Sequence, residues 1–164
     1  MKPVAKSTRA TPADAARQLT AFIGKFEPTH QALIRGARKA LRRRLPAAYE
    51  LAYDNYNFFV IGYSPTERPS DAIISLTAAA NGVGLCFLHG AKLPDPHNVL
   101  LGSGKQTRSV HLDSVGDLAR PEIGALIDAA IARATVPFPQ GRRGQLIIRS
   151  VSAKQRPRRR PAVQ

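Results

Sequence analysis

Residues 49–88, YELAYDNYNFFVIGYSPTERPSDAIISLTAAANGVGLCFL, decide the fold of this chain. They contain four short runs rich in aromatic and β-branched residues, a composition typical of strands. Turn-forming residues separate the runs. Asn81-Gly82 is the strongest of these turn signals, because this pair favours the tight turn of a β-hairpin. The pattern predicts an antiparallel meander with strands at 49–53, 57–63, 72–79 and 83–88.

Helical patterns flank the meander on both sides. Apolar residues recur at helical spacing before and after it, and prolines stand where helices would begin or end. The further predicted elements are helices at 11–27, at 28–45 and from 121, and strands at 108–112 and 145–151. We therefore predict one α+β domain over residues 11–151. It would have two N-terminal helices, an antiparallel sheet of about five to six strands, and a C-terminal helix packed on the sheet.

The net charge of +14 is spread unevenly along the chain. Residues 1–10 carry +3 and residues 142–164 carry +8, both without an acidic residue, so residues 11–141 carry only +3. We predict that residues 1–10 and 152–164 are disordered basic ends. Such ends attract phosphate-rich polymers without reading their sequence.

Several classes of protein are disfavoured by composition. No apolar run approaches the roughly 18 residues that span a bilayer, and the N-terminus lacks the apolar middle of a secretory signal, so we expect a cytoplasmic protein without a membrane partner. The single cysteine, Cys86, rules out an intramolecular disulfide and lies in an apolar run, where an inert thiol is expected. Ser103 lacks the G-x-S-x-G setting of a nucleophile and no base partner can be named, so we expect a non-enzymatic protein.

A glycine-flanked loop is the strongest candidate binding site in the sequence. It comprises Gly102, Ser103, Gly104 and Lys105, and Arg108 follows shortly after. Glycines allow backbone N–H groups to turn toward one point, where an anionic oxygen can be held. We predict that this loop binds a small anion, with a carboxylate or phosphate group, or a protein partner. A tight turn with exposed cations is the simpler interpretation.

The second predicted helix carries a basic face opposite its apolar one, without acidic partners at helical spacing. This face comprises Arg35, Arg38, Lys39, Arg42 and Arg43. It could bind a phosphate group or an acidic partner, although a solvated surface is the simpler interpretation. Together with Arg158, Arg159 and Arg160 of the tail, it raises the alternative of a nonspecific nucleic-acid accessory protein.

Two further groups of residues could form sites. Glu50, Asp54, Asp95 and His97 could each supply one oxygen or nitrogen ligand to a metal ion, although Asp95 between two prolines is better suited to order its loop by accepting backbone N–H bonds. An aromatic cluster could line a pocket through its outward members, although core packing is favoured. That cluster comprises Tyr49, Tyr53, Tyr56, Phe58, Phe59 and Tyr63.

Three segments resemble one known family. The segments LCFLHGAKLPDP, LLGSGKQTR and RPEIGALIDAAIARA, preceded by two helices and a Tyr-Glu-Leu stretch, are similar to the YdhG-like family of small bacterial domains of uncharacterised function. The resemblance covers roughly residues 15–135 and implies a frataxin-like fold. It also implies iron as a possible ligand, since at least one member is regarded as an iron chaperone. Iron binding of that type uses an acidic surface, whereas the first two helices here hold only Asp14 and Glu27 as acids.

Overall fold

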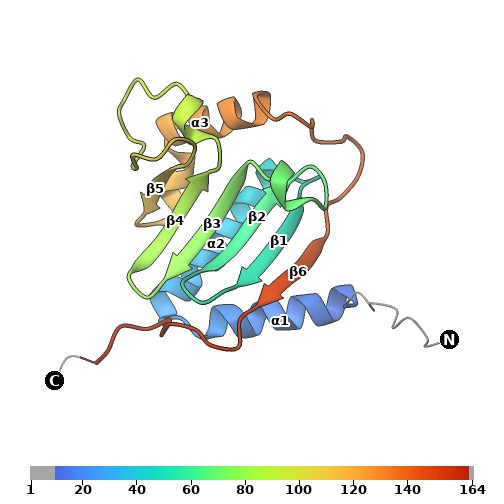
Figure 1. Ribbon diagram of the computed structural model, residues 1–164, viewed down its shortest axis with the longest axis vertical. Coiled ribbons are helices and arrows are strands. Elements are labelled where there is room, and N and C mark those ends of the chain that lie inside the picture. The colour runs from blue at the N-terminus through green and yellow to red at the C-terminus, as the bar shows by residue number, and fades with distance from the viewer. Residues whose placement is uncertain (1–9, 163–164) are drawn as a thin grey trace.

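The computed structural model of the protein describes residues 10–162, so the predicted disorder of residues 1–9 lies outside the described part of the chain. The helices are α1 (Pro12–Gly24), α2 (Pro28–Arg44) and α3 (Pro121–Ala132), and the strands are β1 (Tyr49–Asp54), β2 (Phe59–Ser64), β3 (Ile74–Ala79), β4 (Gly82–Phe87), β5 (Arg108–Leu112) and β6 (Leu146–Val151). This arrangement confirms the predicted α+β fold (Figure 1).

The six strands form one sheet in the order β5-β4-β3-β2-β1-β6. Strands β1 to β5 are a meander in which each neighbour runs antiparallel, as predicted. Strand β6 departs from the prediction, because it lies beside β1 and runs parallel to it, with Leu51 opposite Ile147. The chain leaves α3, returns past the sheet and enters beside β1, which makes the sheet mixed. A strand pattern in the sequence gives no information on which neighbour the strand will choose.

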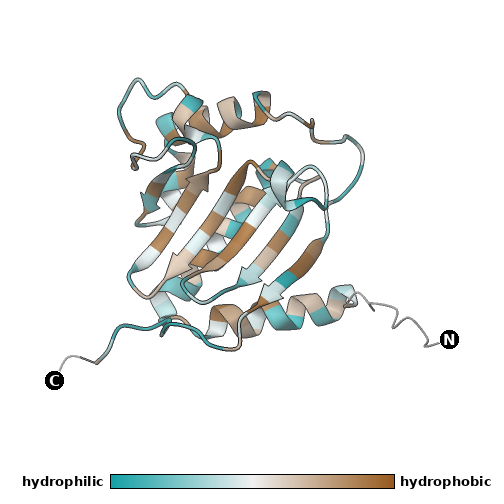
Figure 2. Cartoon of the chain, in the orientation of Figure 1, coloured by the Kyte–Doolittle hydropathy of each residue, from teal (hydrophilic) through white to brown (hydrophobic). Residues whose placement is uncertain are grey.

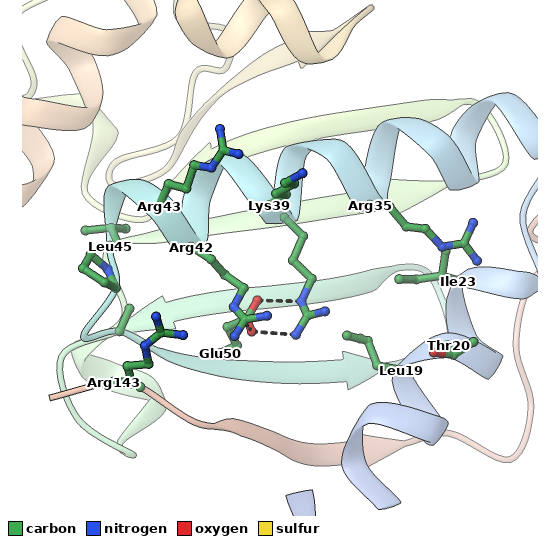
Figure 3. A pocket seen from close by; sticks show the side chains of 14 residues that line it. Leu19, Thr20, Ile23, Arg35, Lys39, Arg42, Arg43, Leu45, Glu50 and Arg143 are labelled. Atoms are coloured by element: carbon green, nitrogen blue, oxygen red, sulfur yellow. Dashed lines mark hydrogen bonds and ion pairs between the residues drawn. The ribbon is translucent and has the colours of Figure 1, made fainter. Parts of the chain in front are cut away.

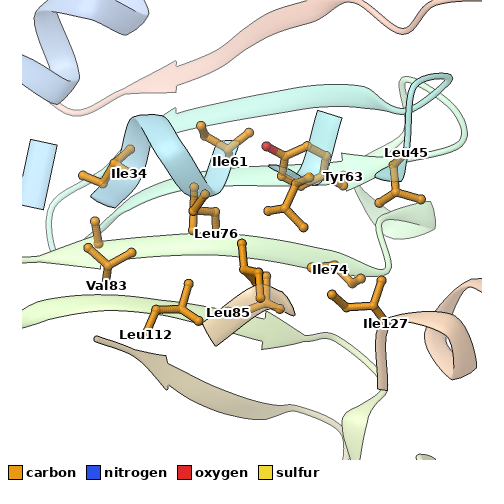
Figure 4. Close-up of a cluster of buried hydrophobic side chains, with 14 of the residues drawn as sticks. Ile34, Leu45, Ile61, Tyr63, Ile74, Leu76, Val83, Leu85, Leu112 and Ile127 are labelled. Atoms are coloured by element: carbon orange, nitrogen blue, oxygen red, sulfur yellow. The ribbon is translucent and has the colours of Figure 1, made fainter. Parts of the chain in front are cut away.

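One face of the sheet packs against the helices (Figure 1). Strand residues that alternate along each strand point to this face, which gives the alternating hydropathy seen in Figure 2. Ile34 of α2 meets Ile61 and Leu76 of the sheet, and α3 adds Ile127 to the same cluster (Figure 4). On β1 the residues that point toward the helices are Glu50, Ala52 and Asp54, so two carboxylates enter the core side of the sheet.

The opposite face of the sheet, which we call the open face, carries no α-helix within residues 10–162, and only the short 3-10 helix Pro69–Asp71 lies at one end of it (Figure 1). Its upper end is bordered by the loop between β2 and β3, where Ala72 lies close to Gly62. Elsewhere Tyr53, Val60 and Thr77 remain half-buried and in part accessible.

Residues 152–162, which we call the tail strap, lie against the end of β1 and the turn that follows it. Ser152 N and Gln155 Nε2 donate to the carbonyl of Asp54 at 2.8 and 2.7 Å, and Arg156 N donates to the carbonyl of Tyr56 at 2.8 Å. These contacts correct the predicted disorder for this stretch. Because β6 ends beside β1, the tail strap begins next to the carbonyl groups of Asp54 and Tyr56, which accept its hydrogen bonds. The basic composition of the tail does not predict these contacts.

Candidate functional site

A cleft of about 580 Å³ opens between α1, α2 and the start of β1. One wall is apolar and comes mainly from Leu19 and Ile23 of α1. Six cationic side chains line the remainder, and we call this the cationic cleft: Arg35, Arg38, Lys39, Arg42, Arg43 and Arg143 (Figure 3). Glu50 is the only acidic residue in the lining. The basic face predicted on the second helix therefore borders a cavity.

Glu50 lies at the floor of the cleft, where its carboxylate is only 4% exposed and already satisfied. Arg38 binds it in a two-pronged contact, with Nε and Nη2 each 2.9 Å from a carboxylate oxygen, and Arg42 Nε lies 3.6 Å away. Tyr63 donates its hydroxyl at 3.0 Å. Such a buried carboxylate holds its arginines in fixed positions.

The protonation states of these groups follow from their surroundings. Burial raises the pKa of Tyr63 well above its ordinary value, and the negative charge of Glu50 adds to this effect. Burial alone would lower the pKa of Arg38, but the hydrogen bond to Glu50 and the attraction of nearby negative charge together outweigh burial and raise it. Tyr63 therefore stays a hydrogen-bond donor, and Arg38 stays charged.

Three cationic side chains of the cleft have no partner among the described residues. Within the part of the chain that the structure describes, Lys39, Arg43 and Arg143 form no hydrogen bond or ion pair, and Arg35 contacts only Gln31. In Figure 3 the side chains of Lys39 and Arg43 project away from Glu50. The cleft therefore holds positive charge that no protein group neutralises.

Gly144 explains how Arg143 reaches the cleft. Its N–H donates to the carbonyl of Pro46 at 3.0 Å. A Cβ atom built on Gly144 would lie 1.6 Å from the carbonyl oxygen of Ala48, so only glycine permits this approach. Arg143 was not predicted as a site residue, because nothing local in the sequence links it to the second helix. The glycine at 144 was the one available signal of a close backbone contact.

The predicted Gly102–Lys105 loop is an exposed turn at the edge of the sheet. Leu101 and Ser109 pair across its base, and Gly102 has a φ of 121°, which favours glycine. Arg108 donates Nη1 to the carbonyls of Gly104 at 2.5 Å and Thr107 at 2.8 Å, so its guanidinium is used within the loop. Ser103 and Lys105 are exposed. Anion binding at this loop stays a prediction.

The four predicted metal ligands lie in two separate settings. Glu50 and Asp54 point to the helix side of β1 and are held by cations. Asp95 accepts the backbone N–H groups of Val99 and Leu100, both at 2.9 Å, which confirms the loop-ordering role, and His97 is exposed in the same loop. Within residues 10–162 no group of three or more His, Cys, Asp or Glu side chains could hold a metal ion.

Asp54 is the second buried carboxylate of β1, at 0% exposure. Lys25 Nζ lies 2.7 Å from Oδ2, and Arg158 Nη2 of the tail strap lies 3.0 Å from Oδ1. Burial would raise the pKa of Asp54, but the bonds from Lys25, Arg158 and Gln155 together lower it. Arg158, predicted to contact nucleic acid, is only 4% exposed and is bound to Asp54 instead. Arg159 and Arg160, predicted for the same role, are exposed.

Comparison of the chain with protein-family models, with curated proteins and with solved structures finds no match. The resemblance to the YdhG-like family therefore stays a prediction. Among the described residues, no helix is both long and apolar enough to cross a bilayer.

Proposed function

We propose that this protein is a non-enzymatic binding domain that holds a small polyanion in the cationic cleft. The observation that carries the proposal is the surplus of charge. Six cations surround one carboxylate, and that carboxylate is already bound by Arg38, Arg42 and Tyr63. Cations grouped without partners repel one another, and a bound anion relieves this repulsion.

The shape of the cleft favours a small molecule. Its volume of about 580 Å³ falls within the range of small-ligand sites, roughly 300–1,000 Å³. Guanidinium groups match the planar carboxylate and the phosphate group in two-pronged contacts, so ligands with two or more such groups suit the site best. Lys39, Arg43 and Arg143 would contact the anion, while Arg38 and Arg42 stay anchored to Glu50.

The cationic cleft is a different site from the Gly102–Lys105 loop, which was the predicted position of the anion. The chemistry proposed is the same, but the unpartnered cations gather at the cleft. The loop has one exposed lysine and an arginine that contacts its own carbonyls.

Isothermal titration calorimetry with pyrophosphate and with citrate, at low salt, tests the proposal. We expect the wild-type protein to bind at least one of them. The variant Lys39→Gln/Arg43→Gln/Arg143→Gln should bind at least tenfold more weakly, because charge-assisted hydrogen bonds contribute about 1.5–3 kcal/mol each.

The control variant Lys105→Gln/Arg133→Gln/Lys154→Gln removes the same charge from exposed positions outside the cleft. It should keep the wild-type affinity to within about threefold, since screening weakens distant charges. If both variants lose the same affinity, overall charge rather than the cleft binds the anion. Absence of heat for both anions with the wild-type protein would also contradict the proposal.

A further inference from the structure

The open face of the sheet presents a row of tyrosines along β1. Residues of β1 alternate between faces, so Tyr49 and Tyr53 point away from the helices, opposite to Glu50, Ala52 and Asp54. The row continues into the turn after β1 with Tyr56, which is 44% exposed. Phe58 in the same turn is 50% exposed. Large exposed rings are unusual on a sheet that has no partner.

Two of these tyrosines are covered by an arginine from the C-terminal part of the chain. The guanidinium of Arg142 lies 4.5 Å from the centre of the Tyr49 ring, and that of Arg156 lies 5.7 Å from the Tyr56 ring. Arg149 sits in the bulge of β6 next to Ser150, the residue that pairs with Tyr53, and is exposed. Two ring–arginine pairs and a further exposed arginine therefore belong to the β1–β6 end of the sheet.

The strands contribute no acidic side chain to this face, although the β2–β3 loop at its border carries Glu67 and Asp71. Glu50 and Asp54 are the only acidic residues in the six strands, and both point to the helix side, where they are buried. Small residues such as Thr77, Gly84 and Ser109 line a hollow of about 250 Å³ in this face, and Phe58 borders it. Accessible rings beside arginines that form no ion pair combine the two elements that hold single-stranded nucleic acid: stacking surfaces for bases and positive charge for phosphates.

We propose that the open face binds single-stranded nucleic acid. Bases stack on Tyr49, Tyr53 and Tyr56, while the phosphates follow the adjacent arginines. In the unliganded protein Arg142 and Arg156 lie over rings that bases would cover, and Arg142 also donates to the carbonyl of Pro65 at 2.9 Å. Binding therefore moves both side chains outward toward the phosphates and breaks the bond to Pro65. This surface is separate from the cationic cleft, which lies on the helix side of the sheet.

A duplex does not fit this surface, because its bases are already stacked and paired. An acidic peptide would need the cations but not the rings. The tyrosines therefore distinguish the proposed ligand from both, and they can be altered without changing charge.

Fluorescence anisotropy with a labelled twelve-nucleotide oligothymidylate tests the proposal. The variant Tyr53→Ala/Tyr56→Ala should bind at least tenfold more weakly with an unchanged salt dependence, the result expected when stacks are lost and phosphate contacts remain. The variant Tyr53→Phe/Tyr56→Phe keeps both rings and should bind as the wild type does. If the alanine pair impairs folding, Tyr56→Ala alone, in an exposed turn, should still weaken binding about fivefold or more.

Tyrosine fluorescence provides a second readout of binding. It has no tryptophan and four tyrosines, of which only Tyr63 is buried in the core. Tyrosine emission should therefore be quenched when the oligonucleotide binds, and a duplex of the same length should quench it little. Wild-type affinity in the alanine variants, or equal binding of the duplex, would overturn the proposal. So would loss of oligonucleotide binding in the Lys39/Arg43/Arg143 variant alone, since that would place the contact in the cationic cleft.

Discussion

The contact between Asp54 and the tail strap allows a quantitative prediction for Arg158→Met. Methionine keeps an apolar side chain near Phe26, whose ring centre lies 6.0 Å from the guanidinium, but it removes the charge. The substitution deletes the 3.0 Å bond to Asp54 and the 2.5 Å bond to the carbonyl of Asn55. Both partners of the ion pair are almost inaccessible, with side-chain exposures of 3% and 0%.

The size of the effect follows from three contributions. Loss of one partner from a buried ion pair costs about 3–5 kcal/mol when the other charge is left alone. Asp54 is not left alone, because Lys25 stays 2.7 Å away. In addition, Nε and Nη1 of Arg158 are buried without a hydrogen-bond partner within the described chain, and their removal relieves a desolvation cost. We therefore expect the free energy of unfolding to fall by about 2 kcal/mol.

Urea unfolding followed by circular dichroism measures this change. With a slope near 2 kcal/mol per molar, the midpoint should fall by about 1 M. Arg159→Met, at an exposed neighbouring position, should change stability by less than about 0.5 kcal/mol. Asp54→Asn combined with Arg158→Met should be no less stable than Arg158→Met alone, because no buried charge is then left with a single partner. If the two substitutions lower the free energy of unfolding additively, or if Arg158→Met keeps the wild-type midpoint, the ion pair between Asp54 and Arg158 does not stabilise the fold as described.

Three further predictions follow from the same structure. The pKa of Asp54 is lowered from 3.8, so its ionised form stabilises the fold above about pH 4. This contribution disappears as the pH falls through the folded-state pKa, so the free energy of unfolding should fall more steeply with acid in the wild type than in Asp54→Asn. Gly144→Ala should destabilise the protein by about 2 kcal/mol or more in thermal unfolding, because the added Cβ would collide with the Ala48 carbonyl. Gly124→Ala in α3 has open space around the added Cβ and should stabilise the protein by about 0.5–1 kcal/mol in the same measurement. Burial raises the pKa of the Cys86 thiol despite a hydrogen bond with Ser75, so alkylation by iodoacetamide at pH 8 should be several-fold slower in the folded than in the unfolded protein, and equal rates would contradict this.

Features with local causes could be predicted from the sequence. Prolines 12, 28 and 121 begin the three helices, since the missing N–H of proline costs nothing in a first turn. A hairpin joins β3 to β4 where Asn81-Gly82 predicted one, although Ala80 and Asn81 form the turn itself and Gly82 already pairs with Ala79. These signals act over a few residues, so the single sequence contains them completely.

Features that depend on distant partners could not be predicted. The basic face of α2 has no acid at helical spacing, so it was compatible with a solvated surface. The partner for Arg38 and Arg42 is Glu50, which reaches them from the next strand. Arg158 had the appearance of a free cation in a basic tail, but Asp54, 104 residues earlier, binds it. Ion pairs between residues far apart in the sequence depend on how the strands are arranged. The pair between Asp54 and Arg158 forms because β6 runs parallel to β1 and ends beside Asp54.

The position of β6 also determines the order in which the sheet can be completed during synthesis. β1 emerges early, yet its outer edge is paired only when residues 146–151 have been made, about 95 residues later. At the synthesis rate of about 5–20 residues per second, that edge stays unpaired for several seconds or longer. An unpaired strand edge is a template for pairing with another chain. Nascent chains that stall before β6 therefore expose β1 to association with their neighbours, and the same segment that ends the sheet protects it from aggregation.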